Sequence, residues 1–140
     1  MTTLDNSNIY EYVDEWIDNS NNVKFTDSED ASYVGNISDW NVSSVTNMNR
    51  LFSSQRKSNL KNFNEDISNW VVDNVTNMTA MFKGAVEFNQ DLSKWNVSNV
   101  EYAALMFQNA INFTSDLSGW QVDKIENMYS MFENASSFDT

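Results

Sequence analysis

One phrase occurs three times in the chain, as FNEDISNWVVDNV at 63–75, FNQDLSKWNVSNV at 88–100 and FTSDLSGWQVDKI at 113–125. Each copy begins with an aromatic residue and has a Ser two positions before a Trp and a Val two positions after it. Self-similarity at a regular spacing is the sequence signature of a repeat architecture. The residues that repeat in this phrase therefore predict the fold, and the residues that vary between its copies are candidates for function.

Alignment on tryptophan extends the repeat over most of the chain. Trp40, Trp70, Trp95 and Trp120 follow one another at intervals of 30, 25 and 25 residues. The other fixed positions are an aromatic seven before each Trp (Tyr33, Phe63, Phe88, Phe113), an aliphatic three before (Ile37, Ile67, Leu92, Leu117) and an apolar pair at eleven and twelve after (Leu51-Phe52, Met81-Phe82, Met106-Phe107, Met131-Phe132). A fifth cycle begins at Phe138. We predict four full repeats and the start of a fifth over residues 23–140, in a single domain with residues 1–22.

The residue types within one cycle predict a short strand, a turn and a short helix. The stretch from Leu92 to Val97 is too short for a helix and rich in strand formers, with Trp95 and Val97 on one face. Ser98 and Glu101 then match a capping box, which predicts the start of a helix. Apolar residues follow at helical spacing, namely Val100, Ala103, Met106, Phe107 and Ala110.

A residue fourteen positions after each Trp marks the expected end of this helix. The four residues at this position are Ser54, Gly84, Asn109 and Asn134. Gly and Asn tolerate the left-handed backbone conformation that closes many helices. No single cycle could bury its apolar side alone, so the cycles should stack. The sequence thus predicts an α/β fold, a right-handed leucine-rich-repeat-like solenoid of short strand–turn–helix repeats with an N-terminal capping helix.

The repeat unit also resembles a known family. FNQDLSKWNVSNV at 88–100, together with VTNMTAMFKGAVEF at 75–88, closely resembles the BspA-like bacterial surface protein repeat, and LSKWNVSNV follows the L-x-x-L-x-L-x-x-N skeleton of leucine-rich repeats with Trp and Val at two positions. The resemblance covers residues 31–140. It implies a leucine-rich-repeat-like fold and a role in adhesion or protein binding, as in surface lipoproteins of mycoplasmas and Listeria. It implies no catalytic residues.

The two ends of the chain carry their own expectations. Residues 5–18 place Ile9, Tyr12, Val13, Trp16 and Ile17 on one face of a helix, which predicts a cap over the first repeat; the alternative is a partner-binding helix. A turn at 19–22 and a short strand at 23–25 should follow. At the other end, the helix predicted around 125–134 could close the stack, the chain could be a fragment, or an open end could stack on another copy.

Two groups of residues are candidates for contact with a partner. The first group comprises the outward positions on either side of each Trp, which vary while their neighbours repeat: Asp39, Asn41, Asn69, Val71, Lys94, Asn96, Gly119 and Gln121. In leucine-rich repeats such positions carry specificity, although a solvated face would vary in the same way. The second group is Arg56, Lys57 and Lys61 in the five-residue insertion within 53–62. Insertions in stacked repeats emerge as loops, either binding or merely solvated.

Residues for catalysis or metal binding are scarce. The chain contains no Cys and no His, so thiolate sites, disulfides and the commonest general base are excluded. Asp66, Asp91 and Asp116 form a column four positions before Trp, where hydrogen bonds to turn N–H groups are a simpler role than calcium binding. The column of Ser two positions before Trp has no base to activate it. We expect no enzyme activity, no metal and no cofactor.

Charge and hydropathy restrict the partners. A net charge of −12 argues against nucleic acid, whose binding depends on Lys and Arg. No apolar run is long enough to span a membrane, and the N-terminus does not resemble a secretory signal. We therefore predict a non-enzymatic module for protein binding or adhesion, whose partner is another protein or a second copy of the chain. The alternative is a structural subunit of a larger assembly, such as a virus particle or surface layer. The resemblance implies a cell-surface or secreted location.

Overall fold

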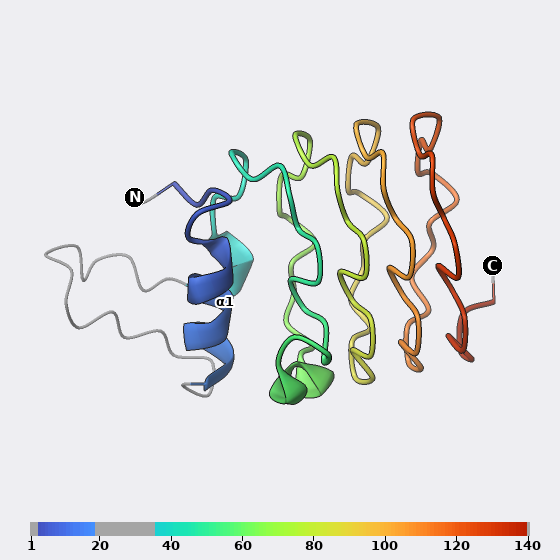
Figure 1. Ribbon diagram of the computed structural model, residues 1–140, viewed down its shortest axis with the longest axis horizontal. Coiled ribbons are helices and arrows are strands. Elements are labelled where there is room, and N and C mark those ends of the chain that lie inside the picture. Colours follow the sequence, from blue (N-terminus) through green and yellow to red (C-terminus); the bar gives the residue numbers. More distant parts are fainter. Residues whose placement is uncertain (1–2, 19–35, 140) are drawn as a thin grey trace, which may run out of the picture.

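The repeats fold as a row of stacked coils with a helix at one end. A computed structural model describes residues 3–18 and 36–139. It contains α1 (Ile9–Asp18) and two short 3₁₀ helices, η2 (Ile37–Asp39) and η3 (Ser58–Asn62). The remaining part of segment 36–139 runs through turns, and the successive coils lie side by side along the long axis of the molecule (Figure 1). The predicted turn at 19–22, strand at 23–25 and core residue Tyr33 lie outside the described residues.

The predicted strand–turn–helix cycle is wrong. Within the described ranges α1 is the only α-helix, and there is no sheet. Neighbouring coils share only isolated parallel bridges, which join Asn47 to Asn77, Asn77 to Tyr102, and Tyr102 to Asn127. The chain is therefore not an α/β leucine-rich-repeat-like solenoid, and neither the strand expected at 92–97 nor the helix expected after Ser98 is formed.

The destination of the backbone N–H groups explains why the expected helix is absent. The N–H groups of Met78, Ala80, Phe82 and Gly84 donate to carbonyl oxygens of the following coil, over 2.8–2.9 Å. Between them, the N–H groups of Met81 and Lys83 donate to the carbonyl three residues earlier, and that of Thr79 donates to the Asn77 side chain. An α-helix needs each of these donors for the carbonyl four residues earlier. Stacking and helix formation therefore compete for the same groups, and stacking prevails.

Left-handed residues break the helical path a second time in each cycle. Ten positions after each Trp the backbone has a φ of 50–61°, at Arg50, Ala80, Leu105 and Ser130. An L-residue in this conformation cannot continue a right-handed helix. The left-handed conformation expected fourteen positions after Trp is present at Gly84, Asn109 and Asn134 but not at Ser54. These residues turn the coil and do not close a helix.

The predicted core residues are buried except in the last coil, where several are partly exposed, and they form columns through the stack. Phe52, Phe82, Phe107 and Phe132 make one column, and Phe63, Phe88, Phe113 and Phe138 make a second. Neighbouring rings within a column have centroids 5.5–6.0 Å apart. The indole N–H groups of Trp70, Trp95 and Trp120 each donate to a carbonyl of the preceding coil, over 2.8–3.0 Å. The fixed Phe and Trp residues of the phrase therefore connect one coil to the next.

Helix α1 packs on the first coil. Ile9, Val13 and Trp16 are buried, as the amphipathic pattern predicts. The rings of Tyr12 and Trp16 contact Trp40 edge-on, with centroids 5.9 and 6.0 Å away. Among the described residues, no helix is long and apolar enough to cross a bilayer, which agrees with the expectation of no membrane span.

Two glycines allow a matched test of the turn geometry. Gly84 has a φ of 72°, and a Cβ added there would overlap the Ser54 hydroxyl oxygen, whereas a Cβ at Gly119 would have nothing within 4 Å. We expect Gly84→Ala to lower the free energy of unfolding by about 1–2 kcal/mol, because Ala disfavours the left-handed region. Gly119→Ala should leave it unchanged or slightly higher. Urea unfolding of both variants measures this, and equal losses would contradict the account.

Candidate functional site

An open polar hollow of about 420 Å³ lies across the last two coils. Residues 93–98 line one side of it, and Gly119 and Gln121 of the next coil line the other. Trp95 and Val97 are buried beneath it, while Lys94 and Asn96, which alternate with them, are exposed. The alternation expected for this stretch is therefore present without a strand. Because Gly119 has no side chain, it leaves the hollow open where the other coils carry Asp39, Asn69 and Lys94.

The hollow gathers half of the outward positions predicted from the sequence. Lys94, Asn96, Gly119 and Gln121 line it. The other four residues, Asp39, Asn41, Asn69 and Val71, are exposed at equivalent positions of the first two coils and do not line it. Ser93 and Ser98 also line the hollow and were missed, because the fixed Ser column suggested only a structural role for Ser93 and the capping-box pattern did so for Ser98.

The hollow offers hydrogen-bonding groups and one positive charge. The Asn96 side-chain oxygen accepts the Ser98 N–H over 3.1 Å, so this part of the amide holds a turn and the amide nitrogen remains as a donor. Lys94 supplies a cation, and its charge is one of the influences that lower the pKa of Asp91, after the hydrogen bonds from Ser93. The hollow can therefore accept polar and acidic groups of a ligand.

Two basic residues of the insertion pair with acidic residues of α1. Arg56 forms an ion pair with Asp14 of α1 at 2.6 Å, and Lys57 forms one with Asp18 at 2.8 Å. The hydrogen bond to Asp18 raises the pKa of Lys57. Lys61 is exposed in η3. Arg56 and Lys57 thus hold α1 on the first coil, and the structure does not bring these three residues to the hollow.

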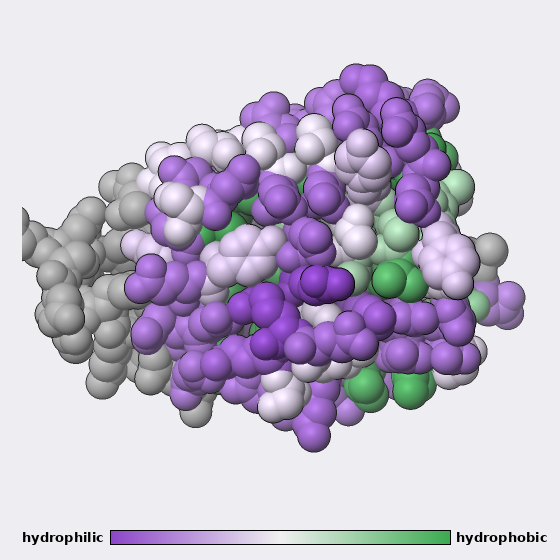
Figure 2. All heavy atoms as spheres, viewed as in Figure 1, coloured by the Kyte–Doolittle hydropathy of each residue, from purple (hydrophilic) through white to green (hydrophobic). Residues whose placement is uncertain are grey.

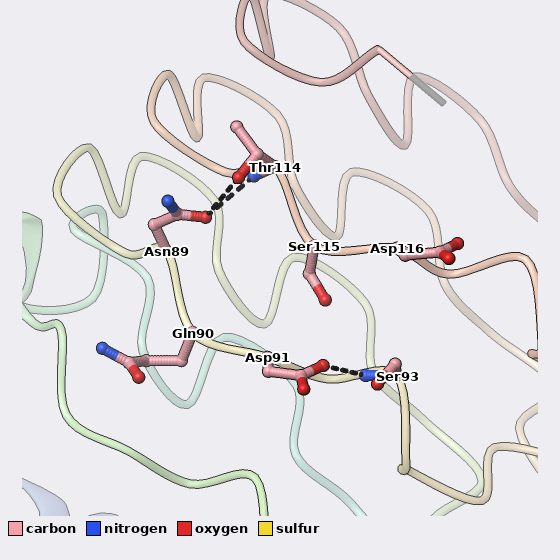
Figure 3. A pocket seen from close by; sticks show the side chains of 7 residues that line it. All are labelled: Asn89, Gln90, Asp91, Ser93, Thr114, Ser115 and Asp116. Atoms are coloured by element: carbon pink, nitrogen blue, oxygen red, sulfur yellow. Dashed lines mark hydrogen bonds between the residues drawn. The ribbon is translucent and has the colours of Figure 1, made fainter.

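Two residues of the acidic column, Asp91 and Asp116, line a second hollow, of about 390 Å³, which Figure 3 shows with its seven labelled side chains. Asp66, Asp91 and Asp116 each accept the N–H of the Ser two residues later, over 2.9 Å. This is the turn bond expected from the sequence. Asp91 and Asp116 come from neighbouring coils in Figure 3. In the described part of the chain, no three acidic residues come together as a metal site would require.

Comparison with known proteins identifies the family over residues 19–140. These residues match the family described as "Mycoplasma protein of unknown function, DUF285". The chain belongs to this family. The match supports a Mycoplasma repeat family but does not confirm the BspA-like repeat. No curated protein and no solved structure matches the DUF285 chain.

The acidic column of this DUF285 protein generates a prediction about pH. Hydrogen bonds from the hydroxyl and N–H of Ser68 and Ser93 lower the pKa of Asp66 and Asp91 below the ordinary value of 3.8, and those of Ser118 do the same for Asp116. A carboxyl with a lower pKa in the folded state takes up its proton more readily when unfolded. The folded chain should therefore lose stability as the pH falls below about 4.

Replacement of all three Asp by Asn removes this source of acid sensitivity. Asn36 already holds the equivalent place in the first coil and accepts the Ser38 N–H over 3.1 Å, so Asn keeps the turn. We expect little change in stability at about pH 7 and a shallower decline between about pH 4 and about pH 2, measured by urea unfolding across the range. An unchanged decline would show that other carboxyls cause it.

Proposed function

We propose that the chain is a non-enzymatic protein-binding module whose hollow at residues 93–98, Gly119 and Gln121 receives a polar loop of another protein. The observation that carries this proposal is the convergence of four varying positions on one opening, above residues that repeat and are buried. A fold whose core residues repeat while its surface residues vary is suited to recognition, because the surface residues can change without loss of the fold. A role in adhesion at a cell surface is the form of this function that the sequence resemblance favours.

The chemistry of the hollow favours binding over catalysis. Asp91 accepts the Ser93 N–H over 2.9 Å, and its lowered pKa makes this carboxylate a weak base. A Ser nucleophile needs a base of higher pKa, such as His, to take its proton. The chain contains no His. The nearby Ser hydroxyls are thus suited to hydrogen bonding.

The groups around the hollow indicate what the bound loop should carry. Lys94 favours a carboxylate, and the side-chain amides of Asn96 and Gln121 can pair with a backbone or a polar side chain. The absence of a side chain at Gly119 leaves room for the tip of a loop. An acidic, hydrogen-bonding loop is therefore the expected ligand, and its binding should weaken as salt screens the charge of Lys94.

Site-specific crosslinking tests this function. A photoreactive phenylalanine in place of Asn96, used in cell extracts, should give a defined crosslinked protein that is absent when the same group replaces the exposed residue Asn112, outside the hollow. Lys94→Glu should reduce the yield by about tenfold or more, because it turns an attraction into a repulsion. Equal labelling from both positions, or yields unaffected by Lys94→Glu, would contradict binding in the hollow.

A second function, as a subunit of a larger assembly, is favoured by the last coil. Val122 is 40% exposed and Met128 is 52% exposed, whereas the equivalent Val72, Val97, Met48 and Met78 are at most 2% exposed. Apolar surface of this kind is a frequent mark of contact between proteins. A second copy of the chain is then the partner. This function requires that the purified chain associates as its concentration rises.

A further inference from the structure

The last coil exposes an apolar surface. In the other coils, the next coil covers the equivalent residues. This tail face consists of Trp120, Val122, Met128, Phe132 and Phe138, which line a hollow of about 270 Å³. Phe132 and Phe138 end the two Phe columns and are only partly buried. In Figure 2, apolar atoms reach the surface toward the end of the molecule that carries the last coils.

The tail face also carries a row of hydrogen-bond donors. In the preceding coil, the N–H groups of Ala103, Leu105, Phe107 and Asn109 donate to the carbonyls of Asn127, Tyr129, Met131 and Glu133. The equivalent N–H groups of the last coil belong to Met128, Ser130, Phe132 and Asn134. These four have no acceptor among the described residues. A row of unpaired backbone groups is a template for pairing with another chain.

Two tail faces do not complement each other. Their contact would set donors against donors and leave these N–H groups unpaired, at a cost for each buried group. It would also bring together two acidic coils, since residues 113–139 contain five acidic residues and one lysine. A complementary partner must offer carbonyl oxygens at matching positions and positive charge.

The first coil of a second copy offers both. Its head face carries the carbonyls of Asn47, Asn49, Leu51 and Ser53, which are equivalent to the carbonyls that accept hydrogen bonds within the stack. Arg50, Arg56, Lys57 and Lys61, half of the eight basic residues, lie in this coil and its insertion. The head face is thus the complement of the tail face in hydrogen bonding and in charge.

Helix α1 now covers this head face. Its Tyr10 hydroxyl donates to the Asn49 carbonyl over 2.6 Å. The guanidinium of Arg56, in the insertion, donates to the Leu51 carbonyl over 2.6 Å and pairs with Asp14 of α1, while Lys57 pairs with Asp18. An apolar, acidic helix therefore lies where an apolar, acidic coil could pack, and it shares Arg56 with the acceptors of the head face.

We propose that the tail face of one copy docks on the head face of a second copy in place of α1. The N–H groups of Ser130 and Phe132 would then donate to Asn49 and Leu51 of the second copy, and the Phe columns would continue across the contact. Helix α1 acts as a competitor that limits this head-to-tail stacking. The inference rests on the second proposed function and assigns its geometry.

Because the chain contains no Cys, a pair of introduced thiols can report this geometry. Parallel bridges join position 47 to 77, 77 to 102 and 102 to 127, so a head-to-tail contact brings Asn127 of one copy beside Asn47 of the next. Neighbouring strands are about 4.8 Å apart, within reach of a disulfide. One chain would carry Asn127→Cys and the other Asn47→Cys, mixed under air.

The mixed disulfide should form, and it should increase when α1 is loosened. Asp14→Asn with Asp18→Asn removes both ion pairs of α1 while leaving its buried face intact, and should raise the yield by about 2- to 30-fold. Val122→Arg on the chain with Asn127→Cys is the matched control, since Val122 is exposed and its change places a repelling charge on the tail face. This variant should abolish the mixed disulfide.

The possible outcomes separate the inference from the function on which it rests. Disulfides formed only between two chains that both carry Asn127→Cys, no mixed disulfide, or a yield insensitive to Val122→Arg would each overturn head-to-tail docking. Light scattering on the same chains reports association in any geometry. Association without the mixed disulfide would leave the assembly function in place and remove this inference, whereas a monomer at all protein and salt concentrations would remove both.

Discussion

The hydrogen bonds between coils determine most other features of this protein. In the first three coils, alternate N–H groups eight to fourteen positions after Trp donate forward to carbonyls of the next coil, and most of the groups between them close turns within the coil. This arrangement satisfies the backbone without helix or sheet, which buried polar groups require in any fold. In this segment it also gives the stack a direction, because the backbone donates on the side of the next coil and accepts on the side of the preceding coil. The two ends of the molecule therefore differ chemically.

The side chains reinforce this direction. The indole N–H groups of Trp70, Trp95 and Trp120 donate back to the preceding coil, opposite in direction to the alternate backbone N–H bonds eight to fourteen positions after Trp. The Phe rings stack at the same spacing and bury their faces against one another. A coil gains these contacts only from its neighbours. Stability should therefore depend on the contacts between coils far more than on any single coil.

The sequence alone predicted the repeat, the buried letters, the amphipathic N-terminal helix and the Asp–Ser turn bonds. These depend on burial and on local hydrogen bonding, which residue types reveal. The sequence-based prediction of secondary structure was wrong. Consecutive turns bury Val100, Ala103 and Met106 at three-residue spacing, which resembles the spacing of apolar residues on one face of a helix. Residue type does not show whether an N–H bonds within its own coil or to the next one. Likewise, the sequence does not show that Arg56 and Lys57 form ion pairs with Asp14 and Asp18.

Amide hydrogen exchange followed by NMR tests most directly the claim that the stack is held by forward hydrogen bonds. Leu105, Phe107 and Asn109 should exchange slowly, because their N–H groups bond to the next coil, whereas Ser130, Phe132 and Asn134 at the equivalent positions should exchange rapidly in dilute solution. Equal protection at the two sets of positions would contradict the account.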